Sequence, residues 1–124
     1  MKLNSFQDAI KDYEQRTGEK FLWPPGMQLK VWDNNEFMVY GIFERDGTRF
    51  FYCDQTYGFF DHMKEWIFAK MRENGLTVIV TVTARDPKAH MRKFKGLKIE
   101  RVPQFDYTFE GRHYFVMKGE IPNA

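Results

Sequence analysis

Cysteine is nearly absent from this 124-residue sequence, in which Cys53 is the single example. One thiol excludes an internal disulfide framework and leaves no CxxC pair for zinc or redox chemistry. No run of about eighteen apolar residues occurs, so no membrane span is expected. The N-terminus leads into an amphipathic segment rather than an apolar signal core. Together these absences predict a cytoplasmic protein.

A large charge imbalance is also missing. The formal net charge is +2, which argues against a dedicated nucleic-acid-binding domain, since such domains usually carry a strongly basic face. Acidic residues dominate from residue 33 to 61, and basic residues dominate from residue 85 to 101. Runs of this kind are usually solvated faces. The basic run is also compatible with an anion site for a phosphorylated cofactor, or with an acidic partner.

Most catalytic motifs are missing as well. The sequence has no P-loop, no GxSxG elbow, no HExxH helix and no EF-hand loop. His62, His90 and His113 are too widely spaced to propose a metal site. The sequence around Cys53 shows no evident His–Asp arrangement that would activate it as a nucleophile, and a buried, inert thiol is the expected state.

The composition suits one folded unit over residues 1–124. Hydrophobic residues make up 43% and aromatic residues 18% of the chain, which is enough for a core without disulfides or metals. A helix is expected over 5–16, with Ser5 as its cap, and the Pro-rich stretch up to residue 26 forms a rigid connection. Strands are expected over 27–32, 37–43 and 49–53, with a tight turn at Asp46-Gly47.

The second half of the sequence alternates between helical and strand patterns. The apolar spacing predicts a helix over 59–74, a buried strand over 76–84 and a short helix that starts at Asp86-Pro87 and is released by Gly96. Strands over 97–102, with an extension through residue 109, and over 112–118 should follow, and 119–124 is expected to be a frayed tail. The predicted class is α/β (α+β) with the order α-β-β-β-α-β-α-β-β.

This order resembles the GCN5-related N-acetyltransferase (GNAT) fold without its usual first strand. The tail carries the closer likeness, in Asp86-Pro87-Lys88-Ala89, in Gly96-Leu97-Lys98-Ile99 and in the segment from Phe109 to Lys118. The resemblance implies a mixed, mostly antiparallel twisted sheet with a central helix and flanking helices. The chain is also similar in style to small, divergent GNAT-like proteins of tailed phages, some of which are internal virion components.

The GNAT resemblance implies acetyl-CoA as cofactor, held by a glycine-containing turn between a strand and the central helix. Gln55-Thr56-Tyr57-Gly58-Phe59-Phe60 lies at that junction. Gln55 and Gly58 match the pattern of the family, whereas Phe60 stands where the family has Gly or Ala. Residues 55–59 are therefore the candidate pyrophosphate site, and Lys88 or Arg92 could meet the 3′-phosphate end. Gly58 could equally serve only to relieve a tight turn.

Catalysis in this family needs a base for the amine and an acid for the departing thiolate, often a tyrosine on the short helix. The corresponding helix here has no tyrosine, and His90 is the candidate substitute. Glu44 and Asp54 are candidate bases near the ends of strands. Tyr107 and Tyr114 are expected to be packing residues of the last hairpin.

Two functions stay open at this point. One is an acyl-CoA-dependent N-acyltransferase that acts on a small-molecule or protein amine, with its ligand in a cleft between the strand ending at Cys53 and the strand over 76–84. The other is a non-catalytic GNAT-fold protein with a degenerate active site. That protein could be phage-encoded and act through protein contacts, as a virion component or as an inhibitor of a host factor.

Overall fold

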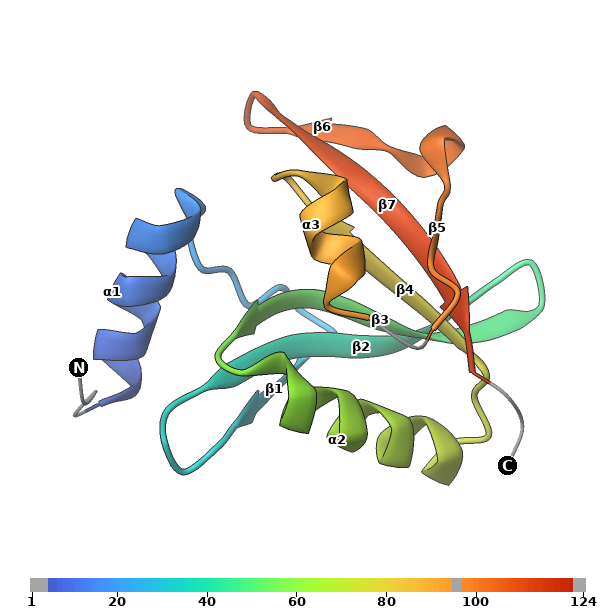
Figure 1. The fold of residues 1–124 in the computed structure, drawn as a ribbon, viewed down its shortest axis with the longest axis horizontal. Coiled ribbons are helices and arrows are strands. Elements are labelled where there is room, and N and C mark those ends of the chain that lie inside the picture. Colours follow the sequence, from blue (N-terminus) through green and yellow to red (C-terminus); the bar gives the residue numbers. More distant parts are fainter. Residues whose placement is uncertain (1–4, 95–96, 122–124) are drawn as a thin grey trace.

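The computed structural model describes residues 5–94 and 97–121, which form a seven-stranded sheet and three α-helices (Figure 1). The strand order is β1-β2-β3-β4-β7-β5, and β6 pairs with β7. The predicted α/β class is confirmed. In chain order the elements are α1 (Phe6–Thr17), β1 (Gln28–Val31), β2 (Phe37–Arg45), β3 (Thr48–Tyr57), α2 (Phe60–Glu73), β4 (Val78–Thr83), α3 (Pro87–Arg92), β5 (Glu100–Arg101), the 3₁₀ turn η1 (Pro103–Phe105), β6 (Tyr107–Phe109) and β7 (Arg112–Glu120).

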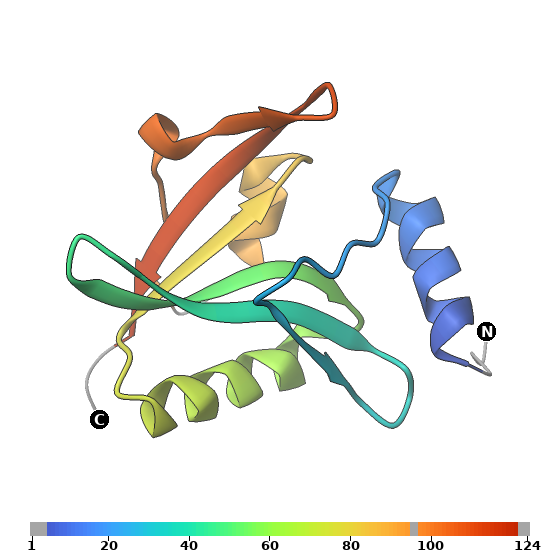
Figure 2. The same ribbon diagram turned by 180° about the vertical axis from the view of Figure 1, so that it is seen from behind.

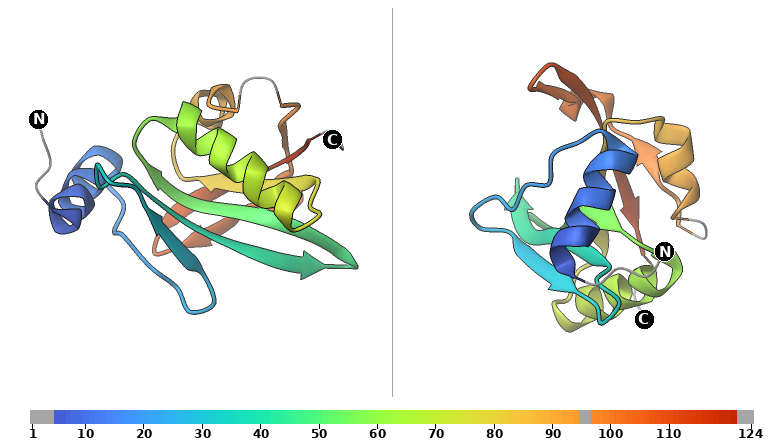
Figure 3. Two further views of the ribbon diagram at one scale, coloured as in Figure 1. Left: turned by 90° about the horizontal axis from the view of Figure 1, so that it is seen from below. Right: turned by 90° about the vertical axis from the view of Figure 1, so that its left-hand side faces the viewer.

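The first helix begins where the sequence predicted. The Ser5 hydroxyl accepts a hydrogen bond from the Asp8 amide at 3.1 Å, which satisfies one of the free N–H groups at the helix start. Ala9 and Tyr13 are the buried residues of α1, and they pack with Phe37 at the start of β2. This packing fixes α1 beside one end of the sheet (Figures 1 and 3).

Strands β1, β2 and β3 form the expected antiparallel meander. Asp46 and Gly47 have φ angles of 52° and 81°, and Arg45 pairs with Thr48 across them. Two successive positive φ angles are typical of the primed turns that match the twist of a hairpin. The predicted turn is therefore confirmed, and β3 extends further than predicted, to Tyr57.

The main core lies between the sheet and helix α2. The buried residues of α2 are Met63, Ile67 and Met71, at the helical spacing expected from the sequence. They share one cluster with strand residues such as Phe51 and Ile79. Strand β4 is paired on both sides, parallel to β3 and antiparallel to β7, as expected for a buried apolar strand.

The segment expected as one strand from residue 97 to 109 is divided into β5, η1 and β6. Proline lacks the N–H group that a strand ladder needs, and the chain turns at Pro103. Asp106 then ties this segment to β7, because its carboxylate accepts the Val116 amide at 2.9 Å and binds Arg101 at 2.6 Å. The expected extension through residue 109 is wrong for this reason, whereas β5 lies within the strand expected over 97–102.

The first three residues of the expected frayed tail over 119–124 are held in the fold. Gly119 and Glu120 belong to β7, and the Ile121 amide donates to the Thr77 carbonyl at 2.8 Å. Residues 1–4, Gly96 with its expected helix-ending role, and residues 122–124 lie outside the described residues. Among the residues described, no helix has the length and apolar character needed to cross a membrane.

Candidate functional site

Strands β3 and β4 are neighbours over only part of their length. Their parallel pairing covers Phe51 to Cys53 against Ile79 to Thr81. Beyond these positions β3 pairs with β2, and β4 pairs with β7, so the two strands separate (Figure 2). The gap starts after Cys53, the residue at which the sequence predicted the end of the strand, although β3 itself continues to Tyr57.

A β-bulge marks the point of separation. Tyr40 pairs with Cys53 and Val39 pairs with Gln55, which leaves Asp54 as an extra residue in β3. A bulge bends its strand, increases the local twist and re-aims side chains. Asp54 therefore coincides with the place where β3 turns away from β4.

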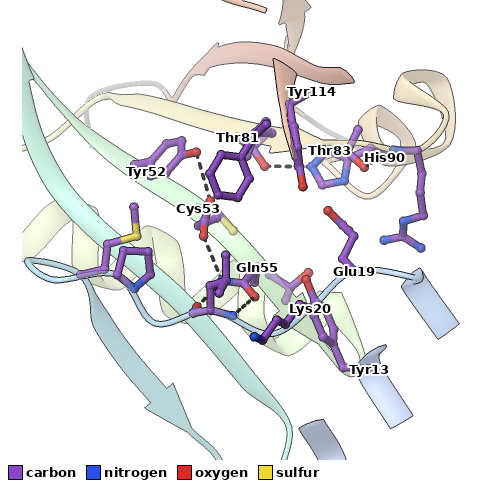
Figure 4. Close-up of a pocket in the computed structure, with 18 of the residues that line it drawn as sticks. Tyr13, Glu19, Lys20, Tyr52, Cys53, Gln55, Thr81, Thr83, His90 and Tyr114 are labelled. Carbon is purple, nitrogen blue, oxygen red and sulfur yellow. Dashed lines mark hydrogen bonds between the residues drawn. The ribbon is translucent and has the colours of Figure 1, made fainter. Parts of the chain in front are cut away.

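A cavity of about 280 Å³, called the inner cavity here, lies at this gap (Figure 4). It is bounded by the connection after α1, by β3, by the end of β4, by α3 and by the β6–β7 hairpin. Its lining includes Tyr13, Glu19, Lys20, Leu22, Tyr52, Cys53, Asp54, Gln55, Thr56, Thr81, Thr83, Arg85, His90, Tyr107 and Tyr114.

Asp54 is the acidic centre of the β3 wall. Its carboxylate accepts hydrogen bonds from the Tyr52 hydroxyl at 3.1 Å and from the Gln55 amide nitrogen at 3.0 Å. Burial raises the pKa of Asp54, and these two hydrogen bonds oppose the rise. A carboxyl group with a raised pKa is a better proton acceptor than an exposed aspartate.

Gln55 joins β3 to the connection after α1. Its side chain donates to the Leu22 carbonyl and accepts from the Leu22 amide at 3.1 Å. This pairing resembles the hydrogen bonding of an added strand, and it holds residues 19–24 over the inner cavity. The Gln55 side chain is thus engaged within the protein.

His90 faces the inner cavity from α3. Its Nε2 lies 2.8 Å from the Thr81 hydroxyl, and its Nδ1 is buried with no hydrogen-bond partner among the described residues. Burial, together with the charges of Lys93 and Arg85, lowers the pKa of His90 to about 3. The ring is therefore neutral near pH 7 and has no imidazolium proton to give to a leaving group.

Cys53 is fully enclosed beside the gap, with 2% of its surface exposed. Burial raises the pKa of its thiol to about 12. Because the thiolate is the reactive form of cysteine, this side chain is inert near pH 7.

A second, outer cavity of about 650 Å³ adjoins the first, and both cavities have Tyr13, Thr56 and Arg85 in their linings. Its other walls come from α1, the β1–β2 turn, the β3–α2 turn and α3. These walls include Arg16, Asp33, Glu36, Tyr57, Gly58, Phe59 and Lys93.

The carboxylate of Glu36 occupies the amide end of the β3–α2 turn. One oxygen accepts the Phe59 amide at 2.9 Å, and the other contacts Nε2 of His62. A Cβ atom on Gly58 would lie 2.3 Å from the Glu36 carboxyl carbon. Glycine at this position therefore makes room for a side chain of the protein itself.

The remaining candidates of the turn have different surroundings. Thr56 lines both cavities. Tyr57 donates its hydroxyl proton to Asp12 of α1. The Phe59 side chain is 80% exposed, and Phe60 packs against Phe94 with their ring centres 4.6 Å apart, across the space between α2 and α3.

Three predicted site residues lie away from both cavities. Glu44 is exposed near the tip of the β2–β3 hairpin, where it pairs with Arg49. Lys88 and Arg92 are exposed on α3 and line neither cavity. No group of His, Cys, Asp and Glu suitable for a metal ion occurs in 5–94 or 97–121.

The structure adds several residues that the sequence did not single out. Arg85 and Lys93 belong to the basic run, but only the folded chain shows that they line the outer cavity. No sequence pattern indicated Glu36 or Glu19 as a site residue, because each is a single acidic residue beside a turn. Tyr52 precedes Cys53 in β3, so strand alternation predicts that the two side chains lie on opposite faces of the sheet. It predicts no functional role for Tyr52.

The order of the elements and the gap between β3 and β4 are those of a GNAT-like α/β fold. Among similar solved structures is the crystal structure of the NatC complex bound to Gag peptide and CoA, with a TM-score of 0.51 and 14% sequence identity. The match covers 70% of this chain and 61% of that chain, so this chain spans about three fifths of its neighbour. At this identity the likeness shows the fold alone, and it supports the GNAT-like fold rather than the phage virion type. No protein-family model matches the chain, and no curated protein matches it.

Proposed function

We propose that the protein is a GNAT-like acyltransferase that transfers an acyl group from acyl-CoA to an amine. The observation that carries this proposal is the separation of β3 from β4 after Cys53 and Thr81. It leaves the stretch from Asp54 to Tyr57 without a strand partner on the β4 side, where backbone N–H and C=O groups can bind an extended chain. Bound acyl-CoA would supply the acyl group as a thioester.

The inner cavity suits an amine acceptor. Glu19 and Asp54 place two carboxylates in its wall, and the rings of Tyr13, Tyr52 and Tyr107 surround them. Carboxylates attract an ammonium group, and aromatic faces add cation–π attraction. Tyr52 and Tyr107 also line an adjoining apolar groove of about 520 Å³, which has room for the body of a larger acceptor.

Asp54 and Tyr114 are the proposed acid–base pair. Asp54 would take the proton that the amine loses on attack, because its raised pKa suits a base. Burial raises the pKa of Tyr114 too, which keeps the hydroxyl protonated and able to donate to the leaving sulfur. Neutral His90 would hold Thr81 in place at the edge of the gap. Tyr114 thus takes the role that the sequence offered to His90.

Binding is the first test. Calorimetric titration with acetyl-CoA should give saturable binding, and acetyl-CoA should raise the melting temperature, since a ligand of the native state stabilises that state. Absence of both effects at millimolar ligand would end the acyltransferase proposal.

A matched pair of carboxylate variants tests the chemistry. Asp54→Asn should lower kcat/KM for transfer to a panel of primary amines by about 10² to 10⁴, the usual contribution of a general base. Glu44→Gln removes a carboxylate from the exposed hairpin and should leave the rate unchanged. Release of the CoA thiol is the readout, and equal rates for Asp54→Asn and the wild type would exclude Asp54 as the base.

One observation favours the second function, a non-catalytic GNAT-fold protein acting through protein contacts. Glu36 accepts a hydrogen bond from the Phe59 amide, which a pyrophosphate would otherwise use. Phe60 packs against Phe94 in the space between the helices. Under this alternative, which includes a phage virion component or an inhibitor, acyl-CoA would give no thermal shift, and no amine would be acylated.

A further inference from the structure

Two cations of the outer cavity lack an anionic partner. Arg85 lies two residues after the end of β4, Lys93 directly follows α3, and both line the outer cavity. Within residues 5–94 and 97–121, no carboxylate lies within ion-pair distance of either side chain. The third cation of this wall, Arg16, is paired with Asp12 at 2.9 Å. Arg85 and Lys93 are therefore the cations available to a ligand.

The surroundings of Lys93 favour an added negative charge. Burial lowers the pKa of Lys93, and the nearby charge of Arg85 lowers it further. Lys93 is partly removed from water and is repelled by the like charge of the exposed Arg85, and an anion bound by both side chains relieves that cost. An arginine fork binds two phosphate oxygens at once, and a lysine adds a compact point charge.

The β3–α2 turn does not offer the same opportunity. Glu36 already accepts the Phe59 amide, and its side chain is only 8% exposed. A phosphate at that amide would meet the Glu36 carboxylate and would be repelled by it. The residues present therefore do not fit a pyrophosphate at this turn.

We propose that Arg85 and Lys93 form the phosphate-binding site of the outer cavity and hold the charged end of a nucleotide-bearing ligand, while Glu36 keeps the turn closed to phosphate. For acyl-CoA as that ligand, the inference rests on the proposed function. The site shares the outer cavity with the turn expected to bind pyrophosphate, and it uses side chains in place of backbone amides.

Calorimetry with three probes tests the site, using CoA, pantetheine (which lacks phosphate) and inorganic pyrophosphate. Arg85→Gln and Lys93→Met, which keep most of the side-chain volume, should each weaken CoA binding by about tenfold to a hundredfold, the range for a hydrogen bond to a charged group. Pantetheine binding should not change. Arg92→Gln and Lys88→Met are the matched controls on α3, and both should bind CoA as the wild type does.

The outcomes separate the inference from the function on which it rests. If CoA binds and neither Arg85→Gln nor Lys93→Met weakens it, the phosphate site is wrong and the acyltransferase proposal stands. If CoA fails to bind but pyrophosphate binds in a way that needs Arg85 and Lys93, the site stands and acyl-CoA is the wrong ligand. If neither CoA nor pyrophosphate binds, both proposals are overturned.

Discussion

Two parts of β3 differ sharply, although they belong to one continuous strand: residues 51–53, called the paired part here, and residues 54–57, called the open part. Between Phe51 and Cys53 the strand is paired on both sides and contributes apolar side chains to the core. From Asp54 onward it is paired on one side only and carries polar groups that line two cavities. The paired part contributes to the core, the open part lines the cavities, and the bulge at Asp54 divides them.

The largest loss of stability is expected from a substitution in the paired part of β3, at Phe51. Phe51 is fully buried and stacks on Tyr40 with ring centres 5.2 Å apart. Phe51→Ala should lower the free energy of unfolding by about 3 to 5 kcal/mol, because it removes the ring and leaves a cavity. Urea unfolding measures the loss, and Phe51→Leu provides a milder variant that stays folded. Phe43→Ala on the exposed hairpin should cost far less, and equal losses at the two positions would contradict the comparison.

The second largest loss of stability is expected at Gly58, directly after the open part of β3. Gly58 has a φ angle of 129°, and an added Cβ would collide with Glu36. Gly58→Ala should cost about 2 to 4 kcal/mol, from backbone strain and a displaced carboxylate together. Gly47→Ala is the control, since Gly47 also has a positive φ but has nothing within 4 Å of the new Cβ. A loss at Gly58 no larger than the loss at Gly47 would show that Glu36 moves aside freely.

Glu36 should also make stability depend on pH. Burial alone would raise its pKa, but hydrogen bonds from Phe59 and His62 outweigh this effect and lower the pKa below the ordinary value of 4.5. The stabilisation is therefore complete above pH 4.5 and is lost as pH falls through the lower folded value. Glu36→Gln should cost about 1 to 2 kcal/mol at neutral pH and should flatten this acid dependence.

Unfolding measured across the acidic range checks the Glu36 prediction. Asp33→Asn changes an exposed carboxylate of the same turn, and it should leave the curve as in the wild type. Identical acid dependence in Glu36→Gln and the wild type would rule out this role for Glu36.

The smallest effect concerns His90. Thr81→Val removes the hydroxyl that pairs with Nε2, leaving both ring nitrogens without a partner, and should cost about 1 kcal/mol. In the wild type the folded pKa of about 3 lies below the ordinary histidine value of 6.5, so protons bind the unfolded chain first and stability falls as pH drops between these values. NMR titration should show a neutral His90 ring between about pH 5 and pH 9. Titration of this ring near pH 6.5 would contradict its burial beside the inner cavity. Thr48→Val on the exposed hairpin is the control for the stability measurement.

Local chemistry explains which features the sequence could predict. Ser5 and Asp86 cap their helices because a short polar side chain reaches amides two or three residues away. Asp46-Gly47 makes its turn for an equally local reason. These features need no knowledge of the rest of the fold.

The site depends on contacts between distant residues, and for that reason it could be predicted only in part. Glu36 meets the Phe59 amide from 23 positions away, which no local pattern encodes. The choice of Lys93 over Lys88 depends on how a six-residue helix packs, and so short a helix has too few turns to fix its buried face. The sequence thus indicated the basic segment, but the members that it singled out, Lys88 and Arg92, line neither cavity.

The bulge at Asp54 also has a consequence for how insertions and deletions in this strand are tolerated. Because one residue is supernumerary, Tyr52 and Gln55 point to the same side of the sheet although they are three apart. Removing that residue would restore strict alternation and allow β3 to run straight alongside β4. We therefore expect that a deletion of this one residue would extend the β3–β4 pairing and reduce the inner cavity, whereas deletions elsewhere in β3 would shift the register of its core side chains.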